Sequence, residues 1–322
     1  MVTSELAIST LAETLRAHPT VRLGDDLDPP QHDALVAWAH TQDLKVLESG
    51  TALERPATLA VTTRPAHATG APWVHCPFAG VEHLAPDLPD GVLLTRTTGT
   101  MPQRIAEYVL AWVLADRWQT GRYLADSASA TWDPSDPPAP AERDGAVVIG
   151  TGAVGRAIGR ALAATGHHVT GLSRSGRPDD AFDVVLPHAQ AHVGLGPSNA
   201  RTDVIVLALP HTPQTVGLVT PELLQAFDGV HLINIGRGSA IRTETLLGAL
   251  DAGHVRRATL DVTEPEPLDS ASPLWRRPDV TITPHVSGLT LPSDVVADLG
   301  TALDEIRTGV RPTSAVARDR GY

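Results

Sequence analysis

A glycine-rich turn between a predicted strand and a predicted helix constrains the fold of this chain more than any other feature. The strand is Ala146-Val147-Val148-Ile149, the turn is Gly150-Thr151-Gly152-Ala153-Val154-Gly155, and a helix follows from 156 to 165. A helix that begins in such a turn directs its free N–H groups and its dipole at an anion. In order, the three glycines permit a tight turn, close approach of a phosphate and close helix–strand packing. The pattern predicts a dinucleotide-binding unit, with a glycine turn that binds no ligand as the alternative.

Short apolar strands and helices alternate after this turn. Strands are predicted at 168–172, 203–209, 230–235, 258–261 and 280–283, and helices at 221–227 and 244–252. Such alternation is typical of a parallel sheet covered on both faces. The sequence therefore predicts a doubly wound α/β fold here, the first of two Rossmann-like domains.

The N-terminal part predicts a second, smaller α/β domain, which we interpret as flavodoxin-like. Its strands are predicted at 21–23, 45–47, 58–62, 73–75 and 91–94, and its helix at 30–41. A long buried helix follows from Thr100 to about Trp118, because Thr100 can cap its first turn and Pro102 loses no hydrogen bond there.

Proline content and chain length suggest where the domains divide. A chain of 322 residues is expected to form about two domains. The stretch 126–144 contains Pro134, Pro137, Pro138 and Pro140 and is interpreted as an ordered surface connection. A last helix, predicted at 293–308, comes after the sheet is complete and is expected to return to the first domain. The predicted division is 98–287 for the nucleotide-binding domain, with 1–97 and 288–322 forming the other.

Charge and cysteine content exclude several classes of protein. The formal charge of −12 disfavours nucleic acid and anionic membranes as partners, because neither polyanion gains by binding an acidic protein. The sequence has no apolar run of about 18 residues and no basic, apolar leader at its start. Its single cysteine, Cys76, rules out an intrachain disulfide and a multi-cysteine metal site. We therefore expect a soluble, cytoplasmic protein without a metal.

The end of the second strand predicts which dinucleotide binds. An NAD site places Asp or Glu about 20 residues after the glycines, to bond the ribose 2′-hydroxyl. This chain has Ser173-Arg174-Ser175 there. A guanidinium and two hydroxyls suit a 2′-phosphate, which favours NADP over NAD. The alternative is a solvated loop in which Asp179 or Asp180 serves NAD.

Arg237 lies just beyond the strand 230–235, between Gly236 and Gly238. The carboxyl ends of parallel strands are where open α/β sheets bind ligands, and flanking glycines would let the backbone approach one. A planar guanidinium can bind a carboxylate with two hydrogen bonds and polarise an adjacent carbonyl. The alternative is an ordinary solvated arginine.

His285 follows the strand 280–283 in the same way, after Pro284. Reduction of a carbonyl requires a proton donor, and histidine is the usual one near neutral pH. Glu266 could bond the imidazole and stabilise its protonated form. Glu264 is a rival for that role, and both could be plain loop charges. Together, these motifs predict hydride transfer to or from a 2-oxo acid.

At these residues the chain resembles the family of D-isomer-specific 2-hydroxyacid dehydrogenases, over nearly its whole length. The matching segments are 232–239, 260–268 and 282–285. The resemblance implies that Arg237 binds the substrate carboxylate and carbonyl, that Glu266 pairs with the histidine, and that His285 is the acid/base. It places these residues at the cofactor: Gly150, Gly152, Ala153, Val154, Gly155, Ser173, Arg174, Ser175, Leu209, Pro210, Thr215, Ile235, Gly236, Asp261 and Gly288.

The segment 73–82 resembles the family's substrate loop. The resemblance implies that backbone N–H groups near Ala79 and Gly80 meet the substrate carboxylate, and that Phe78 borders the substrate side chain. Core packing is the alternative for Phe78. One departure is Glu107-Tyr108, where many relatives have Glu-His, and another is the variable segment 286–290. Both leave the identity of the substrate open.

The Ser-Arg-Ser segment and the ending Arg320-Gly321-Tyr322 are similar to the glyoxylate/hydroxypyruvate reductase branch, which generally uses NADPH. We therefore expect reduction of a small 2-oxo acid to the D-2-hydroxy acid, with NADP preferred over NAD. The family also suggests a homodimer joined through the nucleotide-binding domains. The alternatives are NAD-dependent oxidation of a hydroxy acid in a biosynthetic pathway, and a non-catalytic regulator that senses a dinucleotide.

Overall fold

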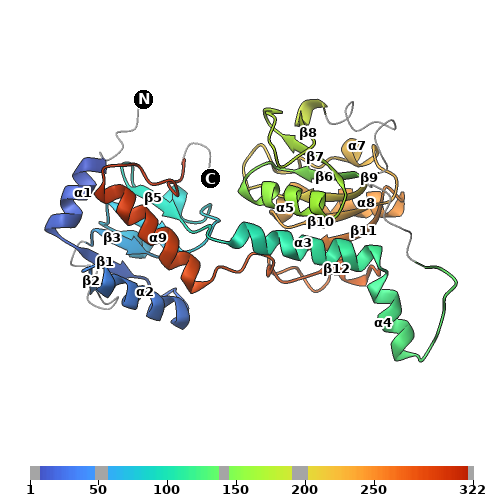
Figure 1. Ribbon diagram of the computed structural model, residues 1–322, viewed down its shortest axis with the longest axis horizontal. Helices are drawn as coiled ribbons and strands as arrows, with labels where there is room; N and C mark the ends of the chain where they lie inside the picture. Colours follow the sequence, from blue (N-terminus) through green and yellow to red (C-terminus); the bar gives the residue numbers. More distant parts are fainter. Residues whose placement is uncertain (1–7, 48–56, 138–144, 191–201, 318–322) are drawn as a thin grey trace. The chain divides into compact units, whose positions relative to one another are not determined.

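The computed structural model describes residues 8–47, 57–137, 145–190 and 202–317. By its internal contacts the chain forms two compact units, which are unit 1 (Met1–Thr100 with Leu289–Tyr322) and unit 2 (Met101–Gly288) (Figure 1). Part of the proline-rich stretch, with Pro138 and Pro140, and the ending 320–322 lie outside the described residues.

Unit 1 contains a five-stranded parallel sheet in the order β2-β1-β3-β4-β5. This is the flavodoxin order, in which the direction of winding reverses between β1 and β3. The predicted flavodoxin-like fold is therefore confirmed. The strands are β1 (Thr20–Leu23), β2 (Lys45–Leu47), β3 (Leu59–Val61), β4 (Trp73–Cys76) and β5 (Leu93–Arg96).

Three helices bury apolar side chains against this sheet, as α1 (Ile8–Ala17), α2 (Pro29–Thr41) and α9 (Pro292–Arg307) share one hydrophobic core with β1 and β3. Helix α2 begins at Asp28, whose side chain accepts a 2.7 Å hydrogen bond from the N–H of Gln31. Helix α9 lies beside α1 and α2 (Figure 1). The last helix of the chain thus completes the core of the N-terminal unit.

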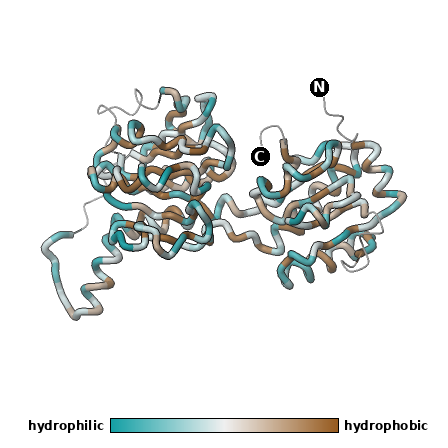
Figure 2. Tube along the Cα trace, turned by 180° about the vertical axis from the view of Figure 1, so that it is seen from behind, coloured by the Kyte–Doolittle hydropathy of each residue, from teal (hydrophilic) through white to brown (hydrophobic). Residues whose placement is uncertain are grey.

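Unit 2 contains a seven-stranded parallel sheet in the order β12-β11-β10-β9-β6-β7-β8. The winding reverses between β6 and β9, which confirms the predicted doubly wound fold. The strands are β6 (Gly145–Ile149), β7 (His168–Ser173), β8 (Val184–Pro187), β9 (Thr202–Leu207), β10 (Val230–Asn234), β11 (Val255–Leu260) and β12 (Val280–Ile282). Figure 2 shows hydrophobic segments of the trace gathered in the interior of each unit. The inner strands are largely buried on both faces, as expected for parallel sheets, whereas the edge strands β2, β8 and β12 are partly exposed.

The α-helices of unit 2 are α3 (Met101–Arg117), α4 (Thr120–Ala128), α5 (Ala153–Ala164), α7 (Pro221–Leu224) and α8 (Thr243–Asp251). Helix α3 packs against α5, whereas α4 projects away from the sheet (Figure 1) and has no buried residue. Within the described residues, none of these helices or those of unit 1 has the length and apolar character needed to cross a bilayer. Single-turn 3₁₀ helices lie at Pro65–Ala68, Ala85–Asp87, His188–Gln190, Gly238–Ala240 and Pro273–Arg276.

Candidate active site

The glycine turn connects β6 to α5 at the point where the sheet of unit 2 reverses its winding. Gly150 has a φ of 109°, and a Cβ added there would lie 2.4 Å from the carbonyl oxygen of Ala208. A Cβ on Gly155 would lie 1.8 Å from the carbonyl oxygen of Gly150. A Cβ on Gly152, in contrast, would meet no atom within 4 Å. Two of the glycines therefore let the chain pack, and Gly152 faces open space.

The free backbone donors of this turn fit a pyrophosphate. The N–H groups of Ala153, Val154 and Gly155 have no hydrogen-bond partner in the described part of the chain. They form the first turn of the 12-residue helix α5, whose dipole favours an anion at this end. The residues present therefore match the phosphate-binding part of a dinucleotide site.

The alternative NAD ligands, in the loop after β7, are already paired. Asp179 lies 3.4 Å from Nε of Arg156, and Asp180 lies 2.9 Å from a guanidinium nitrogen of Arg160. Both arginines belong to α5. Arg174 is exposed. These contacts favour the 2′-phosphate interpretation of the Ser173-Arg174-Ser175 segment, because each carboxylate already has a cationic partner.

Backbone packing at the ends of β9 and β10 explains Gly236 and Gly238. A Cβ on Gly236 would lie 2.6 Å from backbone atoms of Leu209, and a Cβ on Gly238 would lie 2.1 Å from the carbonyl carbon of Thr263. Neighbouring loops therefore explain why both positions lack a side chain, and the expectation that these glycines let the backbone approach a ligand stays a prediction. Nearby, Thr215 donates a 2.6 Å hydrogen bond to the carbonyl oxygen of Pro210.

The turn at Arg237 is organised by Asn234, which the sequence analysis did not single out. The amide of Asn234 donates to the carbonyl oxygen of Arg237 at 3.0 Å and accepts from the N–H of Gly236 at 3.2 Å. The Arg237 guanidinium donates to the carbonyl oxygen of Gly236 at 2.8 Å and is half-buried. The side chain at the end of β10 thus fixes the backbone that carries the arginine.

His285 and Glu266 form a direct pair. Nδ1 of His285 lies 2.9 Å from Oε2 of Glu266, and Oε1 of Glu266 accepts the N–H of Thr263 at 3.0 Å. Of the two rival acids, Glu266 is the one that faces the imidazole. Because Nδ1 is engaged, Nε2 is the nitrogen left to meet a substrate. The imidazole is half exposed, so a small molecule can reach it.

Asp261 lies at the end of β11, between the strands that precede Arg237 and His285. Its side chain is buried and accepts hydrogen bonds from the hydroxyl of Thr283 and from the N–H groups of Val286 and Ser287. Because β10, β11 and β12 are neighbours and parallel, all three predicted residues lie at the carboxyl edge of one sheet. Gly288 follows directly, with its missing Cβ facing Met101 and Ile105 of α3.

The predicted substrate loop of unit 1 exposes backbone donors. The N–H groups of Ala79 and Gly80 have no partner among the described residues. Their carbonyls are held instead, by the Arg96 guanidinium at 3.0 Å and by the Cys76 thiol at 3.6 Å. Burial raises the pKa of that thiol to about 12, so it remains a donor. Phe78 is 41% exposed, which excludes the alternative of core packing.

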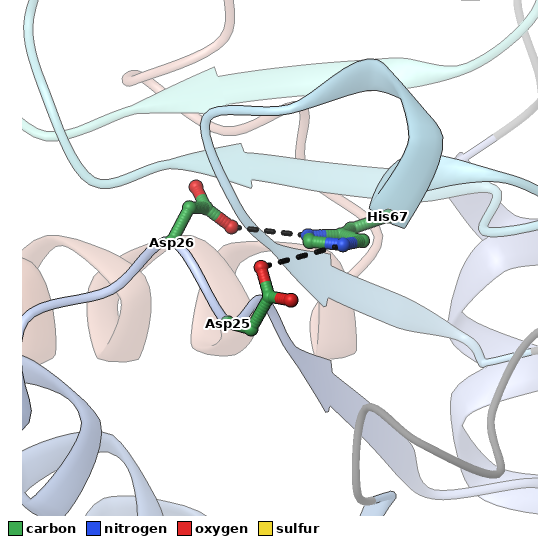
Figure 3. Close-up of side chains that lie close together, drawn as sticks. All are labelled: Asp25, Asp26 and His67. Carbon is green, nitrogen blue, oxygen red and sulfur yellow. Dashed lines mark hydrogen bonds and ion pairs between the residues drawn. The ribbon is translucent and has the colours of Figure 1, made fainter.

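Sequence reasoning missed a polar cluster at the winding reversal of unit 1 (Figure 3). Nδ1 of His67 lies 3.1 Å from Asp26, and Nε2 lies 3.5 Å from Asp25. Among the described residues, these three side chains are close enough to share a metal. Burial alone would raise the pKa of Asp26, but hydrogen bonds from Thr63, Thr62 and His67 hold it below its usual value. The oxygens of Asp26 thus already accept hydrogen bonds from protein donors. We therefore interpret the cluster as a structural link between the loops after β1 and β3.

Comparison with known proteins identifies the family. Residues 110–287 match the family described as D-isomer specific 2-hydroxyacid dehydrogenase, NAD binding domain. The chain is 32% identical over 288 residues to glyoxylate/hydroxypyruvate reductase A of Serratia proteamaculans, which covers 84% of this chain and 89% of that relative.

Two solved structures share the fold. One is a D-isomer specific 2-hydroxyacid dehydrogenase from Xanthobacter autotrophicus in complex with NADPH, with a TM-score of 0.82 and 27% identity over 95% of this chain and 100% of that one. The other is an NADPH-dependent glyoxylate/hydroxypyruvate reductase from Sinorhizobium meliloti in complex with NADP and sulfate, with a TM-score of 0.80 and 28% identity over 94% and 99% of the two chains. The chain therefore belongs to the D-isomer specific 2-hydroxyacid dehydrogenases, a family of oxidoreductases.

Proposed function

We propose that this protein reduces a small 2-oxo acid of the glyoxylate/hydroxypyruvate type to the D-2-hydroxy acid. The observation that carries the proposal is the Glu266–His285 pair, which lies at the same sheet edge as a glycine turn that fits a pyrophosphate. The similarity to glyoxylate/hydroxypyruvate reductases supports the substrate class.

Each of the three polar residues has a distinct role in this reaction. When bound, the reduced dinucleotide would supply the hydride that C2 of the substrate accepts. Arg237 binds the substrate carboxylate and polarises the carbonyl. His285 donates a proton from Nε2 to the oxygen as negative charge develops there, and Glu266 stabilises the protonated imidazole before the transfer. The N–H groups of Ala79 and Gly80, which belong to unit 1, are also proposed to bind the substrate carboxylate.

We propose NADP as the preferred cofactor, because Arg174 and its two neighbouring serines suit a 2′-phosphate. Replacing Arg174 with alanine is expected to raise the KM for NADPH about tenfold or more, since a charge-assisted contact is lost. The KM for NADH should change by less than about twofold, because NADH has no 2′-phosphate. Initial rates with both cofactors measure this, and equal effects on the two would contradict the assignment.

The central test is a spectrophotometric screen of glyoxylate, hydroxypyruvate, pyruvate and bulkier 2-oxo acids with NADPH and NADH. A His285→Asn variant is the best negative control, because His285 has a φ of 53° and asparagine tolerates this conformation. We expect kcat to fall at least about 10²-fold while the affinity for NADPH is retained. His83→Asn, at an exposed position, should behave as wild type.

Other results of the screen would point to the alternatives. Faster oxidation of a hydroxy acid with NAD than reduction with NADPH would favour a biosynthetic dehydrogenase. Tight NADPH binding without turnover of any 2-oxo acid would favour a dinucleotide-sensing regulator. The cytoplasmic location expected from the sequence stays a prediction.

We also propose a homodimer joined through the nucleotide-binding unit. Large apolar side chains are exposed along α4 and its flanks, with Trp118 60%, Leu124 66% and Trp132 95% accessible. Single exposed apolar side chains are ordinary, but three large ones on one helix and its flanks favour an interaction surface. Sedimentation should give a dimer for the wild type and a monomer for Leu124→Ser combined with Trp132→Ser. The exposed Val310 of unit 1 provides the control, since Val310→Ser should leave the mass unchanged.

A further inference from the structure

A chain of hydrogen bonds connects α3 to the loop that carries His285. The hydroxyl of Tyr108 lies 2.6 Å from the hydroxyl of Thr283, and Thr283 donates to Oδ1 of Asp261 at 2.7 Å. Thr283 is separated from His285 by a single residue. These hydrogen bonds therefore connect α3 to the end of β12, next to the proposed acid/base His285.

The direction of each hydrogen bond follows from proton counting. A threonine hydroxyl has one proton, and Thr283 gives it to the carboxylate of Asp261, which can only accept. Tyr108 must then be the donor in its bond with Thr283. Burial, together with the negative charge of Asp261, raises the pKa of Tyr108, so the phenol keeps its proton.

Asp261 in turn holds the backbone of the turn that contains His285. Its carboxylate accepts the N–H groups of Val286 and Ser287, both at 2.9 Å, and its carbonyl oxygen accepts the N–H of His285 at 2.9 Å. His285 itself has a left-handed φ of 53°. One residue thus fastens the turn on both sides of the imidazole, and the orientation of its carboxylate depends on Thr283 and Tyr108.

We propose that Tyr108 is a positioning residue for His285. Its hydroxyl orients Thr283, which orients the Asp261 carboxylate and thereby the turn that presents the imidazole to the substrate. This inference rests on the proposed function, because it assumes that His285 is the acid/base. It also gives a role to the position where many relatives have histidine.

The hydroxyl of Tyr108 is not needed to hold α3 in place. The helix buries Ile105, Val109 and Val113, and Asp116 near its other end pairs with Nε of Arg257 at 3.0 Å. The ring of Tyr108 packs edge-on against Trp112 at 6.2 Å, and phenylalanine keeps that contact. Tyr108→Phe therefore removes the hydrogen bonds of the hydroxyl, to Thr283 and to the Trp112 side chain, and leaves the ring packing.

The test combines kinetics with amide exchange. In Tyr108→Phe, kcat for the best 2-oxo acid should fall about tenfold, while the affinity for NADPH changes by less than about twofold, because positioning and not cofactor binding is lost. Thr283→Val should behave alike, Thr283→Ser should retain activity, and the double variant Tyr108→Phe/Thr283→Val should be no worse than Thr283→Val alone. Tyr123→Phe, at an exposed tyrosine of α4, is the matched control.

Hydrogen exchange separates a failure of this inference from a failure of the proposed function. The amides of Val286 and Ser287 should exchange faster in Tyr108→Phe than in the wild type or in Tyr123→Phe, whether or not any 2-oxo acid is turned over. Unchanged exchange at these two amides would overturn the inference. So would wild-type kcat in Tyr108→Phe, or equal losses of activity and thermal stability in both tyrosine variants.

Discussion

Two acidic residues act on different parts of His285. Buried Asp261 holds the backbone of the turn, whereas half-exposed Glu266 faces the ring at Nδ1. The turn and the ring orientation therefore have separate supports. Loss of either should impair proton transfer in a distinguishable way, because one moves the whole residue and the other frees only the imidazole.

Glu266→Gln tests the support of the ring. The amide can still bond Nδ1 but cannot stabilise a protonated imidazole, so kcat should fall between about tenfold and 10³-fold, part of the usual contribution of acid–base catalysis. The matched control is Glu264→Gln, an exposed carboxylate two positions earlier, which should change kcat by less than about twofold. Steady-state rates decide between them, and similar losses in both variants would contradict the pairing.

The sequence predicted which functional residues follow strand ends better than it predicted which side chains contact one another. Arg237 and His285 could be proposed because each follows an apolar run that had to be a strand. Glu264 and Glu266 could not be separated, since both lie in one loop and only the fold orients them. Tyr108 and Thr283 are 175 positions apart, and nothing in a single sequence relates two such distant hydroxyls.

The glycines of the turn between β6 and α5 occur there for different physical reasons. Gly150 and Gly155 have no room for a side chain because protein backbone lies there. Gly152 has room and an ordinary φ of −74°, so alanine can fold at this position. Only a bound phosphate would then collide with the added methyl group.

Gly152→Ala should therefore separate folding from cofactor binding. We expect the unfolding temperature to stay within a few degrees of wild type, as the backbone is unstrained. The dissociation constant of NADPH should rise about tenfold or more, because the phosphate can no longer approach the backbone. Gly248→Ala, in α8 with equally open surroundings, should leave NADPH binding unchanged. Fluorescence titration measures both, and normal binding by Gly152→Ala would exclude a phosphate at this turn.

Most elements with buried apolar faces were predictable, but α1, which buries Leu11, Ala12 and Leu15, was missed together with elements that lack such a face. All strands except β8, together with helices α3, α8 and α9, follow from apolar periodicity. Helix α4 has no buried residue, so no apolar pattern marks it, and the sequence suggested only a connection beginning near 126. Strand β8 is at the sheet edge and partly exposed, which hides it among loop residues.

Each of the two units has its own parallel sheet, its own winding reversal and a buried histidine. His75 lies in β4 of unit 1 between the hydroxyls of Thr95 and Thr97, and His231 lies in β10 of unit 2. Burial lowers the pKa of His75 to about 3 and that of His231 to about 4. Both imidazoles are thus neutral in the folded protein at pH 5, whereas the unfolded chain protonates them below about pH 6.5.

The folded protein should consequently lose stability on acidification. Between pH 7 and pH 5 these two histidines bind protons in the unfolded state but not in the native state. Each of them therefore lowers the free energy of unfolding by about 2 kcal/mol. Urea unfolding at both pH values measures this loss. His75→Gln should reduce it, or His231→Gln if the first variant does not fold, while exposed His83→Gln should not. A pH dependence identical in all variants would contradict the neutral state of the buried rings.

The tight packing of Gly236 against Leu209 and of Gly238 against Thr263 limits how this scaffold can be re-engineered. The backbone that carries Arg237 is packed tightly between the loops that contain Leu209 and Thr263. Libraries of variants at positions 236 and 238 will therefore mostly yield misfolded proteins. Variation aimed at new acids is better directed to the exposed Phe78, whose side chain can change size without disturbing the sheet.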